Sequence, residues 1–250
     1  MKLSLSPLLI LLFIAIKSFS QQTKEVTEEY GDKYSRVKVK YSVLKDNPTI
    51  KHGPYQFYFT GKLAISGFYK MDKKDSVWQR YNYKGSVLSK KIFTDNKRTG
   101  TWEFYKNDGT LDWQYDFSKD SFINKPEESF EDAYAYQASN GEWVKGKADR
   151  DPVWLRSNYE WQTFLNRTLR YPMDAIENNK MGKPSVEITV DENGETIDYS
   201  VGESVYRALD EEALRVVKLF LPEFLPAEKD GKKVKSKVRI PIVFIIENGR

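Results

Sequence analysis

The spacing of apolar residues after residue 152 predicts a helix and then a hairpin. Between Ser157 and Pro172, large apolar side chains recur at helical spacing at Trp161, Phe164, Leu165 and Leu169. Ser157 and Glu160 have the spacing of a capping box and a proline closes the run, so we expect a short amphipathic helix. Apolar and polar residues then alternate on both sides of the turn at 191–194, which predicts a β-hairpin.

The end of the chain predicts a second helix and a final strand. Apolar residues recur at helical spacing from Leu209 to Phe220, and acidic residues fill the first turn, where they complement the helix dipole. Pro222 ends this helix. Over residues 233–246, apolar residues at alternate positions such as Val238 and Ile240 share one face, and basic residues from Lys233 to Arg239 lie on the other, which predicts one long strand. The predicted fold of this region is α+β, in the order helix, hairpin, helix, strand, with an antiparallel sheet.

A pattern of aromatic residues and glycines occurs three times in the first half of the chain. The copies are HGPYQFYFTGKL at 52–63, DSVWQRYNYKGSVL at 75–88 and TGTWEFYKNDGTL at 99–111. In each copy an aromatic residue is followed three positions later by tyrosine, and then by glycine. Each copy therefore predicts an aromatic strand, a glycine turn and a second strand, which together form one hairpin.

Single hairpins cannot bury both of their faces, so we expect these hairpins to stack as an all-β repeat domain. The aromatic rings would fill the space between neighbours, which makes them core residues rather than a ligand site. Upstream, the alternation in SRVKVKYSVL at 35–44 predicts a half-buried strand that starts the sheet. One copy departs from the pattern, because Ser76 stands where the others have Gly53 and Gly100.

The repeats resemble MORN-like repeats of the YwqK type over residues 52–117. The shared pattern is a glycine, then an aromatic residue, then a tyrosine followed by glycine and leucine. Repeats of this kind generally serve as interaction scaffolds. The resemblance thus implies a protein-binding surface and names neither a partner nor a reaction.

Residues 118–151 lose this regularity and are rich in charged, small and turn-forming residues, so they predict a connector. NGEW at 140–143 echoes TGTW in the third repeat but lacks the following tyrosine, so it predicts at most a degenerate repeat that caps the stack. A repeat domain at 30–117 and a second domain at 152–250 are then expected. Two domains suit a chain of 250 residues.

The region 152–250 resembles the C-terminal domain of TonB-family proteins. The matching landmarks are Tyr171-Pro172, Gly182, VDENG at 190–194, LDEEAL at 209–214, Pro226-Ala227, Gly231 and VRIPIVF at 238–244. The resemblance implies a non-enzymatic domain of the cell envelope. It also implies that the domain captures an extended peptide of an outer-membrane receptor as an added strand and takes part in TonB-dependent transport across the membrane.

Carried onto this sequence, the capturing element is the last strand. Its predicted partner-binding residues are Lys237, Val238, Arg239, Ile240, Ile242, Val243 and Phe244. In strand addition, the main chain of an open edge supplies the affinity, and Pro241, which has no N–H, suits an edge while removing one bonding position. In a second interpretation the lysines only protect a solvent-facing edge from aggregation, and the sequence leaves both open.

The first residues predict a secretory signal peptide at 1–20. Lys2 precedes an unbroken apolar run at 8–16, and small residues lead to a cleavage site after Ser20. A retained membrane anchor is the alternative, although Lys17 interrupts the run short of the length that a spanning helix needs. Export would place the protein in the periplasm or cell envelope of a double-membrane bacterium.

Composition narrows the chemistry that the chain can perform. It has no cysteine and one histidine, His52, so zinc–thiolate sites and histidine-rich catalytic sites lack their residues. Carboxylates are plentiful, but no spacing singles out a catalytic pair. We therefore expect no enzyme activity, no cofactor and no metal. A net charge of +4 without a concentrated basic face also argues against a nucleic-acid partner.

Two departures from the TonB family bear on function. A full energy transducer has a membrane-spanning helix and a proline-rich arm. Here the N-terminal segment is predicted to be a cleaved signal peptide, and the ten prolines do not cluster. We expect an envelope protein that binds an outer-membrane receptor or another envelope partner through its C-terminal domain, with the repeats as a second interaction surface. The alternative is a repeat-based scaffold or antitoxin-like binding module whose C-terminal domain only docks. A homodimer is also compatible with an open-edged sheet.

Overall fold

The computed structural model describes residues 22–31, 36–125, 132–220 and 222–246. These residues form two compact units, one from residues up to 103 together with 115–122, the other from 104–114 together with 123 onward. The segment predicted as a signal peptide lies outside the described residues. In the described part of the chain, no helix is both long enough and apolar enough to cross a membrane.

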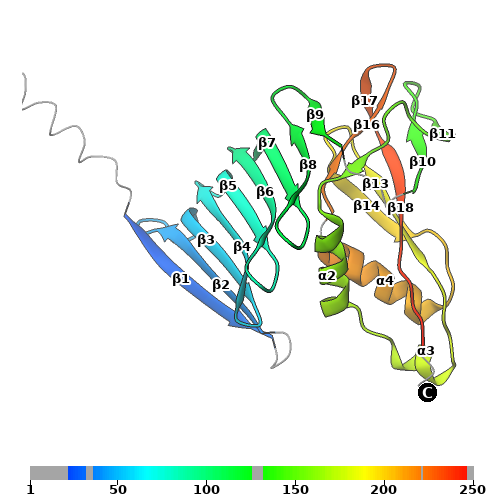
Figure 1. The fold of residues 1–250 in the computed structure, drawn as a ribbon, viewed down its shortest axis with the longest axis horizontal. Coiled ribbons are helices and arrows are strands. Elements are labelled where there is room, and N and C mark those ends of the chain that lie inside the picture. Colours follow the sequence, from blue (N-terminus) through cyan, green and yellow to red (C-terminus); the bar gives the residue numbers. More distant parts are fainter. Residues whose placement is uncertain (1–21, 32–35, 126–131, 221, 247–250) are drawn as a thin grey trace, which may run out of the picture. The chain divides into compact units, whose positions relative to one another are not determined.

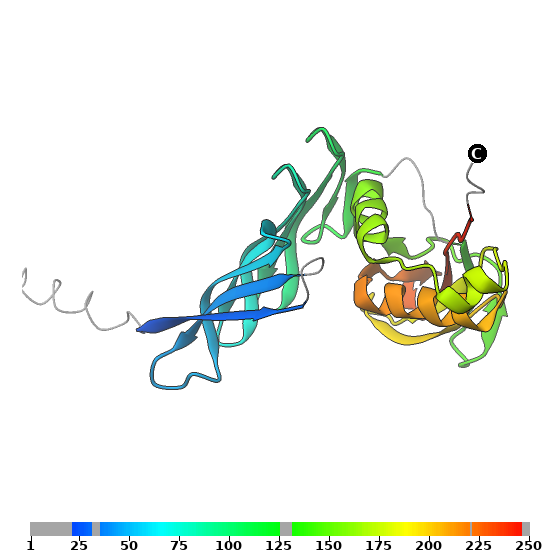
Figure 2. The same ribbon diagram turned by 90° about the horizontal axis from the view of Figure 1, so that it is seen from below.

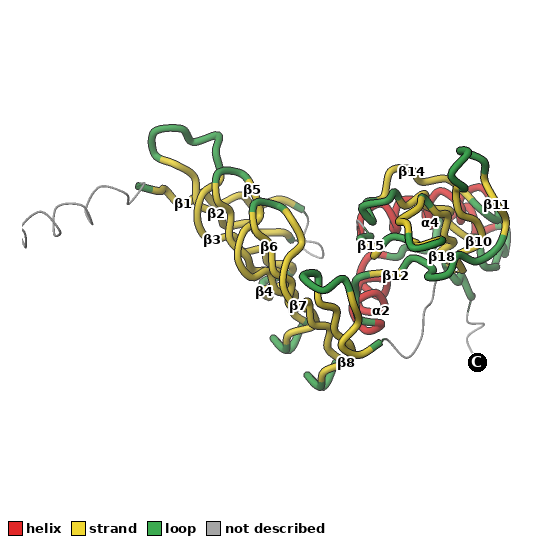
Figure 3. The backbone as a smooth tube through the Cα atoms, turned by 90° about the horizontal axis from the view of Figure 1, so that it is seen from above, coloured by secondary structure: helices red, strands yellow, loops and turns green. Residues whose placement is uncertain are grey.

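A nine-stranded sheet contains the repeats, and its strands lie side by side in chain order (Figure 1). The strands are β1 (Thr23–Tyr30), β2 (Val37–Leu44), β3 (Lys51–Phe59), β4 (Lys62–Lys70), β5 (Lys73–Tyr81), β6 (Val87–Thr94), β7 (Lys97–Tyr105), β8 (Leu111–Asp116) and β9 (Ser121–Asn124). Each predicted repeat is one hairpin, and no helix occurs among the described residues of the first unit (Figure 3). The hairpins join edge to edge, so aromatic rings contact one another along the sheet.

Equivalent contacts recur from one repeat to the next. The indole N–H groups of Trp78 and Trp102 each donate to the carbonyl ten residues earlier, at 3.2 and 2.9 Å. The turn residues Asp72 and Asn96 accept the N–H of Lys51 and of Lys74, at 2.7 and 2.6 Å. Each of these turns is thereby tied to the strand that begins the preceding hairpin. These shared contacts explain the sequence period, because each repeat needs the same residue types at the same places.

The backbone at Ser76 explains why the other repeats have glycine there. Its φ is +59°, in the left-handed region that Gly53 (+118°) and Gly100 (+61°) also occupy. Glycine adopts this region without a steric penalty, whereas a residue with a Cβ does not. The departure seen in the sequence therefore leaves the repeat geometry unchanged and places strain on one serine.

A five-stranded sheet with three helices forms the second unit, with strand order β11-β10-β18-β13-β14. Its strands are β10 (Asp132–Gln137), β11 (Trp143–Lys145), β13 (Ser185–Val190), β14 (Thr196–Val201) and β18 (Ser236–Pro241), and its helices are α2 (Asn158–Thr168), α3 (Met173–Glu177) and α4 (Arg207–Phe220). Two small ladders, β12 (Val153–Trp154) with β15 (Phe224–Leu225) and β16 (Ala227–Lys229) with β17 (Lys232–Val234), complete the unit. Helix α4 lies across one face of the sheet (Figure 2), and its apolar side covers the core.

The α+β fold expected for the C-terminal region is confirmed. Helix α2 begins at the predicted cap, where Ser157 Oγ accepts the N–H of Glu160 at 3.1 Å. The hairpin β13–β14 and helix α4 occupy the predicted segments. The single strand predicted for 233–246 is wrong, because Lys232–Val234 pairs back on β16 before Ser236 starts β18.

Strands β10 and β11 lie in the segment that the sequence predicted as a connector. They form a hairpin whose turn contains most of the NGEW motif, and β10 pairs with β18 of the second sheet. The expectation that NGEW caps the repeat stack is therefore wrong. The hairpin instead extends the sheet of the second unit.

Candidate partner-binding groove

Strand β18, predicted to be an open edge, is paired on both sides over 236–239. Lys237 lies opposite Ala135 of β10 and Thr189 of β13, and Arg239 lies between the same two strands. No local pattern in the sequence indicates that residues 132–137 pair with this strand. A partner strand cannot add beside Lys237, Val238 or Arg239 while β10 remains in place.

The side chains of Lys237 and Arg239 fasten the β10–β11 hairpin. Lys237 Nζ lies 2.7 Å from Glu187 Oε1 and 5.0 Å from the ring centroid of Trp143 on β11. Arg239 pairs with Glu203 at 3.2 Å, and its guanidinium carbon lies 4.1 Å from the ring centroid of Tyr134 on β10. Both cations form ion pairs and cation–π contacts within the domain, so they neither protect an open edge nor remain available to a partner.

Electrostatics around Glu187 strengthen this attachment. Burial alone would raise the pKa of Glu187, but hydrogen bonds from Lys237 and Tyr134 outweigh burial and lower the pKa below 4.5. Burial also raises the pKa of the Tyr134 phenol, and the hydrogen bond to Glu187 raises it further. At neutral pH the carboxylate is therefore charged and the phenol protonated, which is the pair of states that holds the hairpin.

Most of the remaining predicted partner-binding residues belong to the core. The side chains of Val238, Ile240, Ile242 and Phe244 are all buried. The N–H of Ile242 donates to Pro184 O and that of Phe244 to Gly182 O, both at 2.9 Å. Their main chain therefore faces the β13 side, and neither side chain nor main chain is available to a partner.

Val243 is the predicted residue that keeps an accessible edge. The main-chain N–H and C=O groups of successive residues in an extended strand point to opposite sides. Those of Val243 therefore point away from residues 182–184, towards the side on which β10 pairs with residues 236–239. Its side chain is 52% exposed. Among the residues that the structure describes, no hydrogen bond to its main chain is found. Pro241 lies at the same parity, where its missing N–H leaves the β13 ladder intact.

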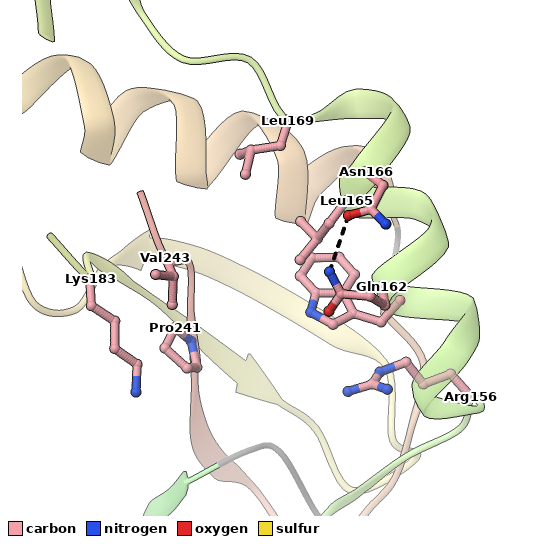
Figure 4. Close-up of a pocket in the computed structure, with 9 residues that line it drawn as sticks. Arg156, Gln162, Leu165, Asn166, Leu169, Lys183, Pro241 and Val243 are labelled. Atoms are coloured by element: carbon pink, nitrogen blue, oxygen red, sulfur yellow. Dashed lines mark hydrogen bonds between the residues drawn. The ribbon is translucent and has the colours of Figure 1, made fainter. Parts of the chain in front are cut away.

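A groove of about 540 Å³ lies between this strand and helix α2 (Figure 4). Its lining residues are Arg156, Trp161, Gln162, Leu165, Asn166, Leu169, Lys183, Pro241 and Val243. Figure 4 shows Lys183, Pro241 and Val243 on the strand side, with Gln162, Leu165 and Asn166 facing them from the helix. Val243 therefore belongs both to the accessible edge and to the lining of the groove.

The charges that line the groove are both positive. Arg156 and Lys183 line it, and among the described residues no carboxylate does. Arg156 is held by stacking on Trp154, 3.9 Å from its ring centroid, and by donating to Ser157 O at 3.2 Å. Gln162 and Asn166 hydrogen-bond to each other along α2 at 3.2 Å. The lining of the groove thus combines apolar side chains, two amides and two cations.

The comparison with protein families bears on the same domain. Residues 167–246 match the family model of the Gram-negative bacterial TonB protein C-terminal domain. The match runs from the end of α2 through β18, which supports the resemblance to the TonB C-terminal domain for this part of the chain. Members of this family are non-enzymatic domains of the cell envelope. Arg156, Trp161, Gln162, Leu165 and Asn166 of the groove precede the matched region.

Two further comparisons add no functional assignment. No curated protein matches the chain. A crystal structure of a mutant of S. aureus TarM in complex with fondaparinux, alpha-GlcNAc-glycerol and UDP shares 12% identity, with a TM-score of 0.27. That match covers 50% of this chain and 25% of the other, and at this TM-score it carries no argument. The MORN-like identity of the repeats stays a prediction.

The helix wall of the groove was not predicted from the sequence. The apolar spacing in α2 assigned Trp161 and Leu165 to the core, and both do pack there while also lining the groove. Gln162 and Asn166, at i and i+4 beside that apolar face, were the available signal for a second exposed wall. Which strand lies opposite depends on tertiary folding that no local pattern contains.

Proposed function

We propose that this protein is a cell-envelope protein whose TonB-like C-terminal domain binds an extended segment of a partner by strand addition at residues 241–245. The partner class that suits the family is an outer-membrane receptor or another envelope protein. The observation that carries the proposal is the accessible edge at Val243 beside a groove, within a domain that matches the TonB family. Participation in TonB-dependent transport follows if the partner is a receptor.

The geometry limits how such a partner binds. A peptide residue opposite Val243 exchanges two main-chain hydrogen bonds with it in an antiparallel pair. Further bonds are available from the carbonyl of Pro241 and from Ile245, whose side chain is 67% exposed. Pro241 itself donates none. Since this edge is short, side-chain contacts with α2 must add to the affinity, which is how strand addition gains selectivity.

Site-specific photo-cross-linking tests this proposal in the full chain, expressed in a double-membrane bacterium. A cross-linking amino acid at Val243 is expected to capture the extended periplasmic segment of an outer-membrane receptor, identified by mass spectrometry of the linked peptide. In the same chain, V243P removes the edge N–H and should weaken binding about 5- to 10-fold, while V243T keeps the N–H and serves as the matched control.

Two further cross-linker positions separate the alternatives. Ile197 is exposed on β14, the opposite edge of the same sheet, and Tyr83 is exposed in the repeat domain. Receptor capture at Val243 but at neither control supports the proposal. Capture at Tyr83 alone would favour the repeat-based scaffold, and capture at Ile197 alone would move the binding edge to β14.

A further inference from the structure

We infer that the groove selects an extended partner segment that carries acidic side chains, recognised by Lys183. This inference rests on the proposed strand addition at Val243 and specifies the chemistry of its partner. The two cations approach the groove from different elements, Arg156 from the residue before the α2 cap and Lys183 from the segment that leads into β13. Arg156 is itself buried, at 4% exposure, whereas Lys183 is exposed, so the charge that a bound carboxylate meets directly is that of Lys183.

Register places Lys183 next to the open edge. Ser185 lies opposite Pro241 and Gly182 opposite Phe244, so Lys183 lies opposite Val243 in the same ladder. Side chains directly opposite each other project from the same face of a sheet. A peptide residue paired with Val243 on its other side also projects from that face, so its carboxylate and the long lysine side chain approach each other across Val243.

The charge of Lys183 is not neutralised within the described part of the chain. No carboxylate there lies within ion-pairing distance of its Nζ, whereas Lys237 and Arg239 on the neighbouring strand each have an acidic partner. No acidic residue of the described ranges lines the groove, so a basic partner segment would meet only like charge. Val243, Leu165 and Leu169 supply apolar contacts for the other side chains of the peptide.

The groove is lined by residues both inside and outside the matched family region. Arg156 and the wall formed by Trp161, Gln162, Leu165 and Asn166 all precede residue 167, where the family match begins. Strand addition uses main-chain groups that any strand could offer, while the preference for acidic residues comes from the side chain of Lys183, which lies within the matched region. The two features are therefore separable by experiment.

Three synthetic probes measure the preference with the full chain. They are acetylated and amidated nonapeptides of alternating threonine and valine in which the same two threonines are replaced by glutamate, glutamine or lysine. Binding is measured by fluorescence anisotropy, and the site by the amide signal of Val243 in NMR spectra. We expect the glutamate peptide to bind about 5- to 10-fold more tightly than the glutamine peptide, and the lysine peptide to bind most weakly.

Variants of Lys183 test the assignment to these residues. K183Q should remove most of the difference between the glutamate and glutamine peptides, and K183E should reverse the preference towards the lysine peptide. K180Q makes the same change of charge at an exposed lysine outside the groove and should leave the preference intact. The preference of the native chain should also shrink as salt increases, because exposed ion pairs are screened.

The outcomes separate the two proposals. If all three peptides perturb the Val243 amide and bind with equal affinity, the acidic preference is wrong and strand addition stands. If K180Q and K183Q act alike, the assignment of the preference to Lys183 is wrong. If no peptide perturbs the Val243 amide, both the preference and the proposed function are overturned. A glutamate preference that V243P retains with undiminished affinity would keep the charge recognition and reject the strand pairing.

Discussion

The two sheets of this protein differ in how far apart in the sequence their neighbouring strands lie. In the nine-stranded sheet every strand neighbours the next strand in the chain, and the turns at Asp72 and Asn96 are each tied to the hairpin before them. In the five-stranded sheet, β10 crosses to β18, so Ala135 pairs with Lys237. The first arrangement leaves a period in the sequence, while the second leaves only two short strand patterns with nothing to connect them.

This difference matters for function because the long-range pairing decides where an edge remains. In the repeat sheet, the two edge strands are β1 and β9, the first and the last of the sheet along the chain. In the second sheet, the β10–β11 hairpin covers 236–239 and confines the accessible part of the predicted capture strand to Val243 and its neighbours. The pairing of β10 with the distant strand β18 thus defines the candidate site.

Removing the central tryptophan of the repeat sheet should have the largest effect. Trp102 is fully buried, packs against Phe93 and Phe117 with ring centroids 5.0 and 4.7 Å away, and donates to Ile92 O. We expect W102A to cost about 3–5 kcal/mol of unfolding free energy. Denaturant unfolding followed by circular dichroism measures the cost.

Hydrogen exchange of the same variant tests whether the two units are separate. Lost amide protection should be confined to the repeat sheet and should spare α4. W143A is the matched control, since Trp143 is 41% exposed on β11 and should cost about 1 kcal/mol or less. Equal loss of protection in α4 and in the repeat sheet of W102A would contradict the division into two compact units.

Detaching the long-range strand should have the next largest effect. Ala135 is buried and pairs with Lys237 on one side and Lys145 on the other. A135P removes a ladder hydrogen bond from a strand that is paired on both sides, and we expect a local cost of about 3 kcal/mol. Hydrogen exchange should then accelerate at 236–239, while the β13–β14 hairpin stays protected.

A substitution at the same position without the proline effect provides the control. A135S keeps the N–H and should change exchange at 236–239 much less than A135P does. If A135P leaves exchange at 236–239 unchanged, the β10 pairing contributes little to the protection of β18. The long-range pairing would then not decide which part of β18 remains accessible.

The sequence predicted those parts of the fold that depend on neighbouring residues. The cap at Ser157, the hairpin around Asp191 and the repeat hairpins all have their deciding residues within a few positions of each other. The alternation of tyrosine and alanine in DAYAYQ at 132–137 was a local strand signal, but its partner lies in β18, so the candidate edge was placed too early in the strand. Predicting the groove and the accessible edge would require knowledge of the β10–β18 pairing, which joins residues too far apart for a local sequence pattern to reveal.

Acid should weaken the attachment of the β10–β11 hairpin. The pKa of Glu187 is lowered in the folded chain, so its contribution to stability is present above the unfolded value near 4.5 and is lost as pH falls through the folded value. We expect E187Q to cost about 1.5 kcal/mol at pH 7. It should also flatten the loss of stability below pH 4.5, measured by urea unfolding across pH. D198N, at an exposed carboxylate on β14, should change neither.

The smallest effect should be a gain in stability within the repeat sheet. Because Ser76 lies in the left-handed region and Gly100 occupies the equivalent position, S76G should stabilise the chain by about 0.5–1 kcal/mol through relief of backbone strain. The opposite change, G100A, should destabilise it, since a Cβ there would lie 3.2 Å from Ile92 Cδ1 as well as in the left-handed region. Thermal unfolding of both variants measures the pair. A loss of stability in S76G would mean that the hydrogen bond from Ser76 Oγ to Asp75, at 2.9 Å, outweighs the strain, and that the repeats tolerate serine there for a reason of their own.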